Sequence, residues 1–268
     1  MDLGLRDGTA VIAGGSRGMG RATAELLARE GCRVAVLARG ASDLEEAEAA
    51  LRADGAPDVL ALRADLLDTS QVEAAFDAVS RRWGELNALV CAAGPGTDGT
   101  FAELVDRDWV RAFDEGALTA VRCVRAALPL LRRARFARIV TLAATSTRQQ
   151  SPRLVAYTAA KAALVSITKN LARSLAPEGI IVNCLCPGWV LTPSVERYLR
   201  ELAANAGLAG NDLDAAYREG TRMFGSANDL GRPGRPEEVA AMAVLLCSPL
   251  AGFTVGGTIP VDGGTDFF

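Results

Sequence analysis

The residues best suited to chemistry are Tyr157 and Lys161, four positions apart in the segment Tyr-Thr-Ala-Ala-Lys. Residues four apart on a helix lie on one face, so the phenol and the ammonium would be neighbours. A free tyrosine has a pKa near ~10, and an adjacent cation lowers that pKa by stabilising the phenolate. We therefore expect Tyr157 to be a proton donor whose pKa is lowered by Lys161. Exposed Tyr and Lys at this spacing are also common on solvated helix faces, so the pair needs support from the rest of the chain.

Histidine is absent from the 268 residues, which excludes Ser/His/Asp and Cys/His nucleophiles and the HExxH zinc site. The six cysteines are scattered through apolar segments without a CxxC pair. They indicate reduced core thiols, and no metal site is predicted. Acid–base chemistry must therefore come from Tyr, Lys, Cys or carboxylates.

Composition indicates a soluble chain with a large core: 50% of residues are apolar and the mean hydropathy is +0.17. One α/β domain over residues 1–268 is expected. A net charge of -3, a pI near 5.3 and the lack of a basic patch with aromatics argue against a nucleic-acid partner. No apolar run reaches ~18 residues and no signal-peptide pattern is present, so we expect a cytoplasmic protein without a membrane partner.

Short apolar runs alternate with helical patterns along the chain. Because the runs are not patterned in and out, they indicate a parallel sheet covered on both faces. Gly116 interrupts a long helical pattern and requires a kink or close packing there. The segment 193–230 is a helical insert of the length typical of lids and binding loops. Strands are predicted at 9–13, 33–38, 59–63, 87–91, 138–143, 180–186 and 257–261, and helices at 21–30, 42–54, 69–82, 107–133, about 157–177 and 237–247.

The first predicted strand runs into a glycine turn, residues 14–20, and then into a helix. This arrangement aims backbone N–H groups and a helix N-terminus at a phosphate. The second strand ends in Ala38, Arg39 and Gly40, without the acid that an NAD site would place there. Arg39 and Arg17 together could bracket a 2′-phosphate, which favours NADP(H) over the alternative of two solvated arginines.

These motifs, in this order, resemble the short-chain dehydrogenase/reductase family over essentially the whole chain. The resemblance implies an α/β, single-domain Rossmann fold with a doubly wound seven-stranded parallel sheet and helices on both faces. It also implies a homo-oligomer, a tetramer or dimer, that pairs the helices containing Gly116 and Tyr157. The motifs that carry it are Gly14, Gly18 and Gly20; Asp65; Ala92, Ala93 and Gly94; Tyr157 and Lys161; Pro187, Gly188 and Thr192; and Val261, Asp262, Gly263 and Gly264.

The resemblance further implies roles for individual residues. Tyr157 would exchange the proton, Lys161 would hold the nicotinamide ribose, and Asp65 would lie by the adenine. Val190 and Thr192 would lie by the carboxamide. The implied NADP(H)-binding set is Gly14, Ser16, Arg17, Gly18, Met19, Gly20, Arg39, Asp65, Leu66, Ala92, Ala93, Gly94, Tyr157, Lys161, Pro187, Gly188, Val190 and Thr192.

Two positions depart from the family pattern. The serine that holds the substrate carbonyl normally precedes the tyrosine by thirteen residues, where this chain has Ala144. An asparagine normally follows a tryptophan by seven residues, and after Trp109 that position is Gly116. Thr145 or Ser146 could supply the missing hydroxyl if the loop shifts.

The leading hypothesis is an NADPH-dependent ketoreductase acting on a small-molecule carbonyl compound, which the insert suggests is medium-sized or large. One alternative is a catalytically weakened NADP(H)-binding subunit or sensor in an oligomer. Another is a non-redox isomerase or cyclase on the same frame, with Tyr157 as its acid. The terminal Phe267 and Phe268 are expected to dock on a neighbouring surface.

Overall fold

Seven short, mostly buried strands form one parallel sheet in a computed structural model that describes residues 1–96, 99–205 and 212–265. Their order is β3-β2-β1-β4-β5-β6-β7. The order reverses beside β1, which pairs with both β2 and β4. Ligands of such sheets bind at this switch point, outside the carboxyl ends of the strands. The strands are β1 (Thr9–Ala13), β2 (Arg33–Ala38), β3 (Val59–Arg63), β4 (Ala88–Cys91), β5 (Ala137–Leu142), β6 (Ile180–Pro187) and β7 (Thr258–Val261).

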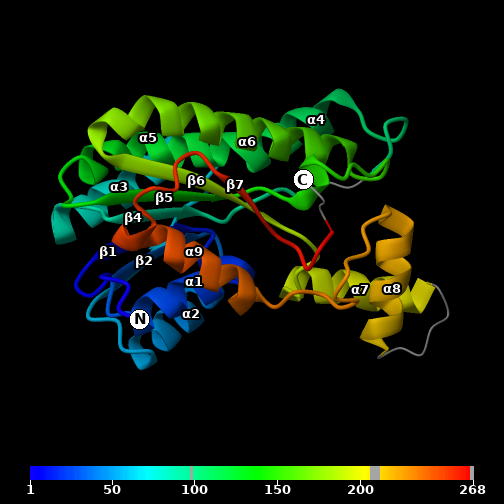
Figure 1. The fold of residues 1–268 in the computed structure, drawn as a ribbon, viewed down its shortest axis with the longest axis horizontal. Helices are drawn as coiled ribbons and strands as arrows, with labels where there is room; N and C mark the ends of the chain where they lie inside the picture. Colours follow the sequence, from blue (N-terminus) through cyan, green and yellow to red (C-terminus); the bar gives the residue numbers. More distant parts are fainter. Residues whose placement is uncertain (97–98, 206–211, 266–268) are drawn as a thin grey trace.

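Helices cover both faces of the sheet, which confirms the predicted doubly wound α/β fold (Figure 1). Each face has its own apolar core between sheet and helices. The bounds of most strands and helices agree with the sequence prediction to within a few residues. The first helix begins earlier than predicted, at Gly18, inside the glycine turn. One layer contains α1 (Gly18–Arg29), α2 (Ala41–Ala53) and α9 (Pro236–Cys247), and the other contains α3 (Thr69–Trp83), α5 (Thr119–Leu131) and α6 (Val155–Leu175).

The long helical pattern around Gly116 is broken in the middle. Helix α4 (Asp106–Phe113) passes through a π-helical turn, Asp114–Leu118, into α5. A Cβ added to Gly116 would lie 2.8 Å from the Cβ of Ala160 on α6. The glycine therefore serves both expected purposes, since it permits a local change of helical pitch and close packing.

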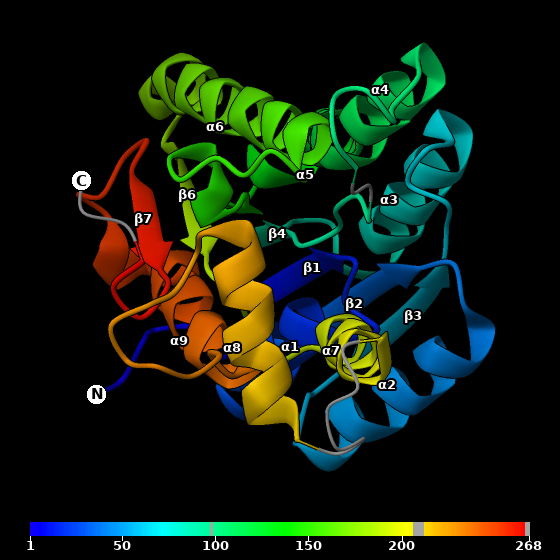
Figure 2. The same cartoon turned by 90° about the vertical axis from the view of Figure 1, so that its right-hand side faces the viewer.

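The insert forms two helices, α7 (Pro193–Asn205) and α8 (Leu213–Phe224), beyond the carboxyl ends of the strands (Figure 2). They pack on each other through Leu199, Ala203 and Tyr217. Its predicted helical character is thus confirmed. The predicted docking of Phe267 and Phe268 lies outside the described residues.

All six cysteines are unpaired and buried, as the sequence indicated. Across the three described ranges of the chain, none of the helices has the length and apolar character needed to cross a membrane.

Candidate active site

Two cavities open along the carboxyl edge of the sheet. A cavity of about 330 Å³ lies over β1, β2 and β3, and a second of about 390 Å³ lies between α6, the end of β6 and the insert. Gly96 lines both, so the two cavities adjoin. One elongated ligand could therefore reach from the first cavity to the second.

The glycine turn after β1 forms the floor of the first cavity, and its backbone is tightly packed. A Cβ on Gly20 would collide with the carbonyl of Gly14, and one on Gly14 would lie 2.8 Å from the amide nitrogen of Ala93. Side chains are thereby kept away from the N-terminus of α1. The exposed helix end provides unsatisfied N–H groups that suit a phosphate.

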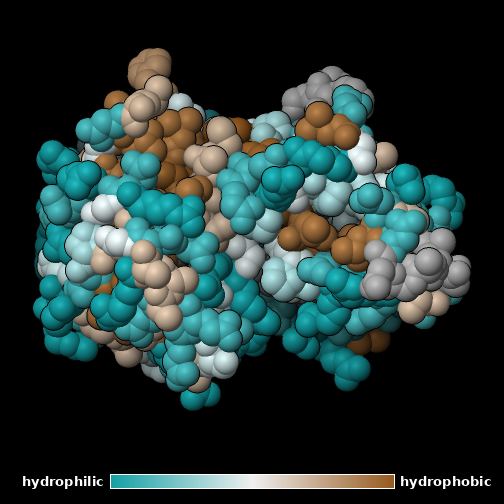
Figure 3. All heavy atoms as spheres, turned by 90° about the horizontal axis from the view of Figure 1, so that it is seen from below, coloured by the Kyte–Doolittle hydropathy of each residue, from teal (hydrophilic) through white to brown (hydrophobic). Residues whose placement is uncertain are grey.

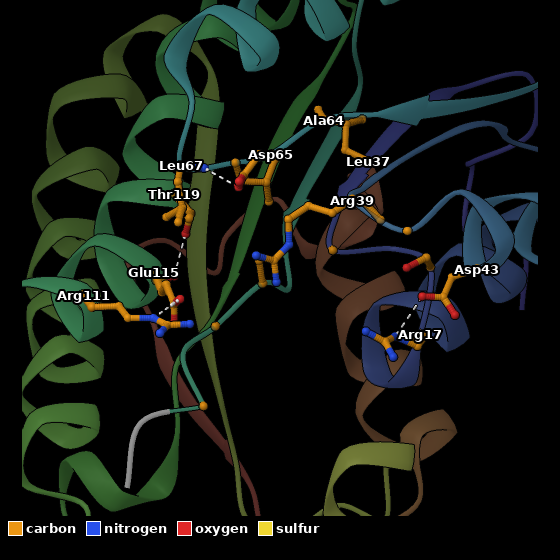
Figure 4. A pocket seen from close by; sticks show the side chains of 18 residues that line it. Arg17, Leu37, Arg39, Asp43, Ala64, Asp65, Leu67, Arg111, Glu115 and Thr119 are labelled. Carbon is orange, nitrogen blue, oxygen red and sulfur yellow. Dashed lines mark hydrogen bonds and ion pairs between the residues drawn. The ribbon is translucent and has the colours of Figure 1, made fainter. Parts of the chain in front are cut away.

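Arginines converge on the first cavity from two elements (Figure 4). Arg17 leaves the glycine turn and forms an ion pair of 3.3 Å with Asp43 of α2. Arg39, which follows β2, extends into the space between Arg17 and Glu115. Its guanidinium has no ion pair to another residue within the described part of the chain. It is therefore the better placed of the two to bind an additional anion.

The far wall of this cavity was not predicted from the sequence. It comes from α4 and the π-helical turn, where Arg111 donates to Glu115 at 2.8 Å and Thr119 donates to the backbone carbonyl of Glu115. The π-helical turn that contains Gly116 supplies Glu115 to this wall. In the sequence, only Gly116 within the long helical pattern indicated that this segment is unusual.

Tyr157 reaches the second cavity from the first turns of α6, where the residue is half-buried. Lys161, one helical turn later, is only 3% exposed and does not line either cavity. Its ammonium donates a 2.7 Å hydrogen bond to the carbonyl of Leu142 at the end of β5. It also lies beside Gly94, where an added Cβ would be 2.9 Å from Nζ. Lys161 is thus held beneath the junction of the two cavities.

The electrostatics of this pair correct one sequence-based expectation. Burial raises the pKa of Tyr157 to about 12, with a further rise from the nearby thiol of Cys186. Burial also lowers the pKa of Lys161 to about 8, partly opposed by the surrounding cysteines. The prediction that Lys161 lowers the tyrosine pKa is therefore wrong for the protein without cofactor, since desolvation of the phenolate dominates. Tyr157 consequently remains protonated throughout the neutral range.

The loop after β5 bears on the missing serine. Ala144 presents its methyl group to the second cavity, and Thr145 and Ser146 line it as well. The Thr145 hydroxyl is engaged, because it donates to the carbonyl of Pro187 at 3.3 Å. The Ser146 hydroxyl is buried without a hydrogen-bond partner. Of the two candidates, Ser146 is therefore the one free to rotate toward a substrate oxygen.

Opposite this loop, aromatic residues form a wall that sequence reasoning did not assign to the site. Trp189 packs against Phe224 with ring centroids 5.6 Å apart, and Tyr198 lies 6.2 Å from both rings. Ser226 fixes the indole by accepting its N–H at 2.7 Å. Figure 3 shows apolar atoms exposed between the main body and the right-hand part of the molecule that carries α7 and α8. Trp189 was detectable, since it lies between Gly188 and Thr192 of a recognised motif.

Most of the predicted site residues line one of the two cavities. Four of them line neither cavity: Gly18 faces Thr192, Gly20 packs on Gly14, and Ala92 and Lys161 lie beneath the residues that form the cavity walls. The first cavity is lined by Gly14, Ser16, Arg17, Arg39, Asp65, Leu66, Ala93 and Gly94, and the second by Met19, Thr145, Ser146, Tyr157, Pro187, Gly188, Val190 and Thr192.

The residues present fit an NADP(H) molecule. The glycine cradle leaves backbone N–H groups open to a pyrophosphate, and Arg39 lies where the ribose nearest β2 would carry a 2′-phosphate. The adjoining cavities would receive the nicotinamide near Tyr157. The second cavity would then hold the substrate.

Comparison with known proteins gives consistent matches. A family model described as enoyl-(acyl carrier protein) reductase matches residues 13–266. The short-chain reductase protein NovJ of Streptomyces niveus is 32% identical over 259 residues, covering 97% of this chain and 94% of that protein.

Solved structures superpose over nearly the full length. L-sorbose reductase from Gluconobacter frateurii, complexed with NADPH and L-sorbose, has a TM-score of 0.92 at 32% identity, covering 99% of this chain and 98% of that one. An NADPH-bound short-chain oxidoreductase from Pseudomonas aeruginosa PAO1, described as containing an atypical catalytic center, has a TM-score of 0.88 at 34% identity, covering 98% and 99%. The fold and the sequence thus agree on the same relatives.

Proposed function

Because the chain belongs to the short-chain dehydrogenase/reductase family, we propose that it is an NADPH-dependent ketoreductase that reduces a carbonyl group to an alcohol. The observation that carries this proposal is the pair of adjoining cavities, one containing Arg39 and the other Tyr157. Both structural neighbours described above were solved with NADPH, which supports the same cofactor here.

Bound NADPH would supply a hydride to the carbonyl carbon. The Tyr157 hydroxyl, with its pKa of about 12, remains protonated at neutral pH and donates its proton to the carbonyl oxygen. An alkoxide is a stronger base than a phenolate, so this transfer is downhill even from a phenol with a raised pKa. The unpartnered Ser146 hydroxyl donates a hydrogen bond to the same oxygen in place of the absent serine at position 144. Lys161, beneath the junction of the two cavities, would while protonated place a positive charge under the cofactor ribose and the developing oxyanion.

Replacing Tyr157 with phenylalanine tests the proposal directly. We expect Tyr157→Phe to lower kcat on a ketone panel by at least ~10²-fold, because the general acid is removed. NADPH affinity, measured by fluorescence titration, should remain within about twofold. A variant that retains wild-type kcat would refute the role of the phenol. A wild-type protein that binds NADPH and oxidises none of it with any ketone would favour the alternative of an NADP(H)-binding subunit.

We also propose a homo-oligomer, a dimer or tetramer, in the cytoplasm. Exposed apolar side chains on and near α4, among them Phe101 and Val110, support the association. Leu250 and Phe253, after α9, form another such surface. The six unpaired cysteines support a reducing compartment.

A further inference from the structure

The first cavity carries opposite charges on two of its sides. Arg39 extends into it from the end of β2, and its guanidinium has no ion pair to another residue within the described ranges. Glu115 lines the far wall from the π-helical turn, together with Arg111 (Figure 4). A 2′-phosphate at Arg39 would account for the positive side. It leaves the acidic side without a function.

Glu115 is more withdrawn from water than a surface ion pair requires. Its side chain is 16% exposed, whereas the side chain of its partner Arg111 is 71% exposed. Other described ion pairs with the same spacing along a helix have acids that are 24% to 40% exposed, namely Glu25, Glu48 and Glu196. An exposed ion pair contributes little to stability, so the pair with Arg111 does not by itself explain a carboxylate on this wall.

One of the two carboxylate oxygens of Glu115 is engaged. Arg111 Nε donates to Oε1 at 2.8 Å, and no residue in the described part of the chain donates to Oε2. Thr119 lines the same wall, but its hydroxyl donates to the backbone carbonyl of Glu115. A carboxylate oxygen accepts hydrogen bonds and cannot donate them. A ligand at this wall must therefore bring a donor.

The turn that carries Glu115 is tied to the loop that follows β3. Arg122 of α5 donates to the carboxylate of Asp114 at 2.6 Å and to the backbone carbonyl of Leu66 at 3.5 Å. The same loop lines the cavity through Asp65 and Leu66. The position of Glu115 relative to this loop is thus fixed before a ligand binds.

The adenosine half of NADPH matches these two sides. Its phosphates are anions that a carboxylate repels, and the nicotinamide half would lie near Tyr157 in the second cavity. Because the 2′-oxygen carries the phosphate, the donors left on the adenosine are the adenine amine and the 3′-hydroxyl. In NAD sites, an acid near the end of the second strand binds the ribose, and this chain has Arg39 there. Glu115 offers a carboxylate from the opposite wall instead.

We propose that Glu115 accepts a hydrogen bond from the adenosine half of NADPH, donated by the adenine amine or by the 3′-hydroxyl. The inference rests on the NADPH dependence proposed above. Arg39 and Glu115 then bind the adenosine from two walls, Arg39 through the phosphate and Glu115 through a neutral donor. Glu115 is thus a specificity residue for the cofactor, whatever the ketone.

The test measures nucleotide binding without ketone or turnover. The protein is titrated calorimetrically with adenosine 2′,5′-bisphosphate, with its 3′-deoxy analogue and with inosine 2′,5′-bisphosphate, which lacks the amine. We expect one of the two analogues to bind at least ~10-fold more weakly than the adenosine compound, because a hydrogen bond to a charged group is lost. The weaker analogue identifies the donor. In Glu115→Met, the ratio for that analogue should fall to within about twofold.

Glu115→Gln guards against misfolding of the methionine variant. It keeps the shape of the side chain and an acceptor oxygen without the charge, so its ratio should be about threefold. Glu48→Met is the matched control, because Glu48 forms the same kind of pair with Arg52 on α2, away from the cavity. It should preserve the wild-type ratio.

Two results would overturn the proposal while leaving the NADPH dependence intact. One is equal binding of all three nucleotides by the wild type. The other is a wild-type ratio that survives in either Glu115 variant. If adenosine 2′,5′-bisphosphate binds no more tightly than adenosine 5′-phosphate, the preference for NADPH fails, and the inference about Glu115 fails with it.

Discussion

The two cavities obtain their properties in different ways. The first is built from backbone: glycines at 14 and 20 keep side chains away from the start of α1, and few side chains need a particular position. The second is built from side chains brought in by the loop after β5 and by the insert. A backbone cradle tolerates few substitutions, whereas a side-chain site can transfer a task to a neighbouring residue.

Ala144 illustrates the second case. In the first cavity, a methyl group on Gly20 would collide with the Gly14 carbonyl, and no neighbour could compensate. In the second, we propose Ser146, two residues along the chain, as the substitute for the hydroxyl absent at Ala144, because Ser146 is unpartnered and lines the same space. The comparison therefore predicts that the required hydroxyl can be supplied from either of two positions at the substrate end, whereas the glycines at the nucleotide end have no substitute.

The largest expected effect tests whether the hydroxyl can move between positions 146 and 144. We predict that Ser146→Ala lowers kcat by ~10²- to 10³-fold, the usual cost of removing one donor to a developing oxyanion. Thr145→Val should cost much less, since that hydroxyl is already bonded to Pro187. Adding Ala144→Ser to the Ser146→Ala variant should recover most of the loss. Steady-state kinetics on one ketone measures all three, and a greater loss from Thr145→Val would transfer the role to Thr145.

At the nucleotide end, the expected effect is a change in the preference for NADPH over NADH. Arg39→Ala should raise the Kd for NADPH by ~10- to 100-fold, because a charge-assisted hydrogen bond is worth about 1.5–3 kcal/mol. The Kd for NADH should hardly change. Arg17→Ala should have a smaller effect, since Arg17 is paired with Asp43.

Arg52→Ala is the control, because Arg52 lies on α2 and is paired with Glu48 away from the cavity. Equal losses for NADPH and NADH in Arg39→Ala would show that Arg39 does not read the 2′-phosphate. Fluorescence titration with each cofactor provides the values.

The same contrast governs how far the sequence could be interpreted. The sheet, its helices and the glycine cradle were predictable, because each depends on residues adjacent in the chain. Even the break at Gly116 was signalled by its residue type. The position of Arg39 in the first cavity was predicted from its place directly after a strand.

The substrate end was predicted less completely because its contacts join distant segments. Gln149 meets Gly225 across 76 residues, and Trp189 meets Phe224 only after the insert has folded back. The pKa of Tyr157 was misjudged for a related reason. The sequence shows that Tyr157 and Lys161 are four residues apart on one helix. The burial that raises the pKa of Tyr157 depends on the assembled cavity and cannot be read from that spacing.

The smallest expected effect is a pH dependence of NADPH binding that distinguishes titration of Lys161 from titration of Tyr157. Lys161 has a lowered pKa of about 8, so its amine is protonated and positively charged well below that pH and loses the charge above it. Tyr157, with a pKa of about 12, does not titrate in this range. We therefore predict that the Kd for NADPH is constant between pH 6 and 7 and rises ~10-fold by pH 9, in the wild type and in Tyr157→Phe alike.

A guanidinium keeps its proton throughout this range, so Lys161→Arg should flatten the profile whatever it does to the absolute affinity. Lys169→Arg is the matched control, because Lys169 lies on the same helix but donates to Gly256 at an exposed position. It should preserve the rise. A rise that disappears in Tyr157→Phe would mean that the phenol titrates near pH 8, and that Lys161 does lower its pKa once the cofactor is bound. The two cavities would then be coupled through that helix, and the nucleotide end could no longer be treated as independent of the substrate end.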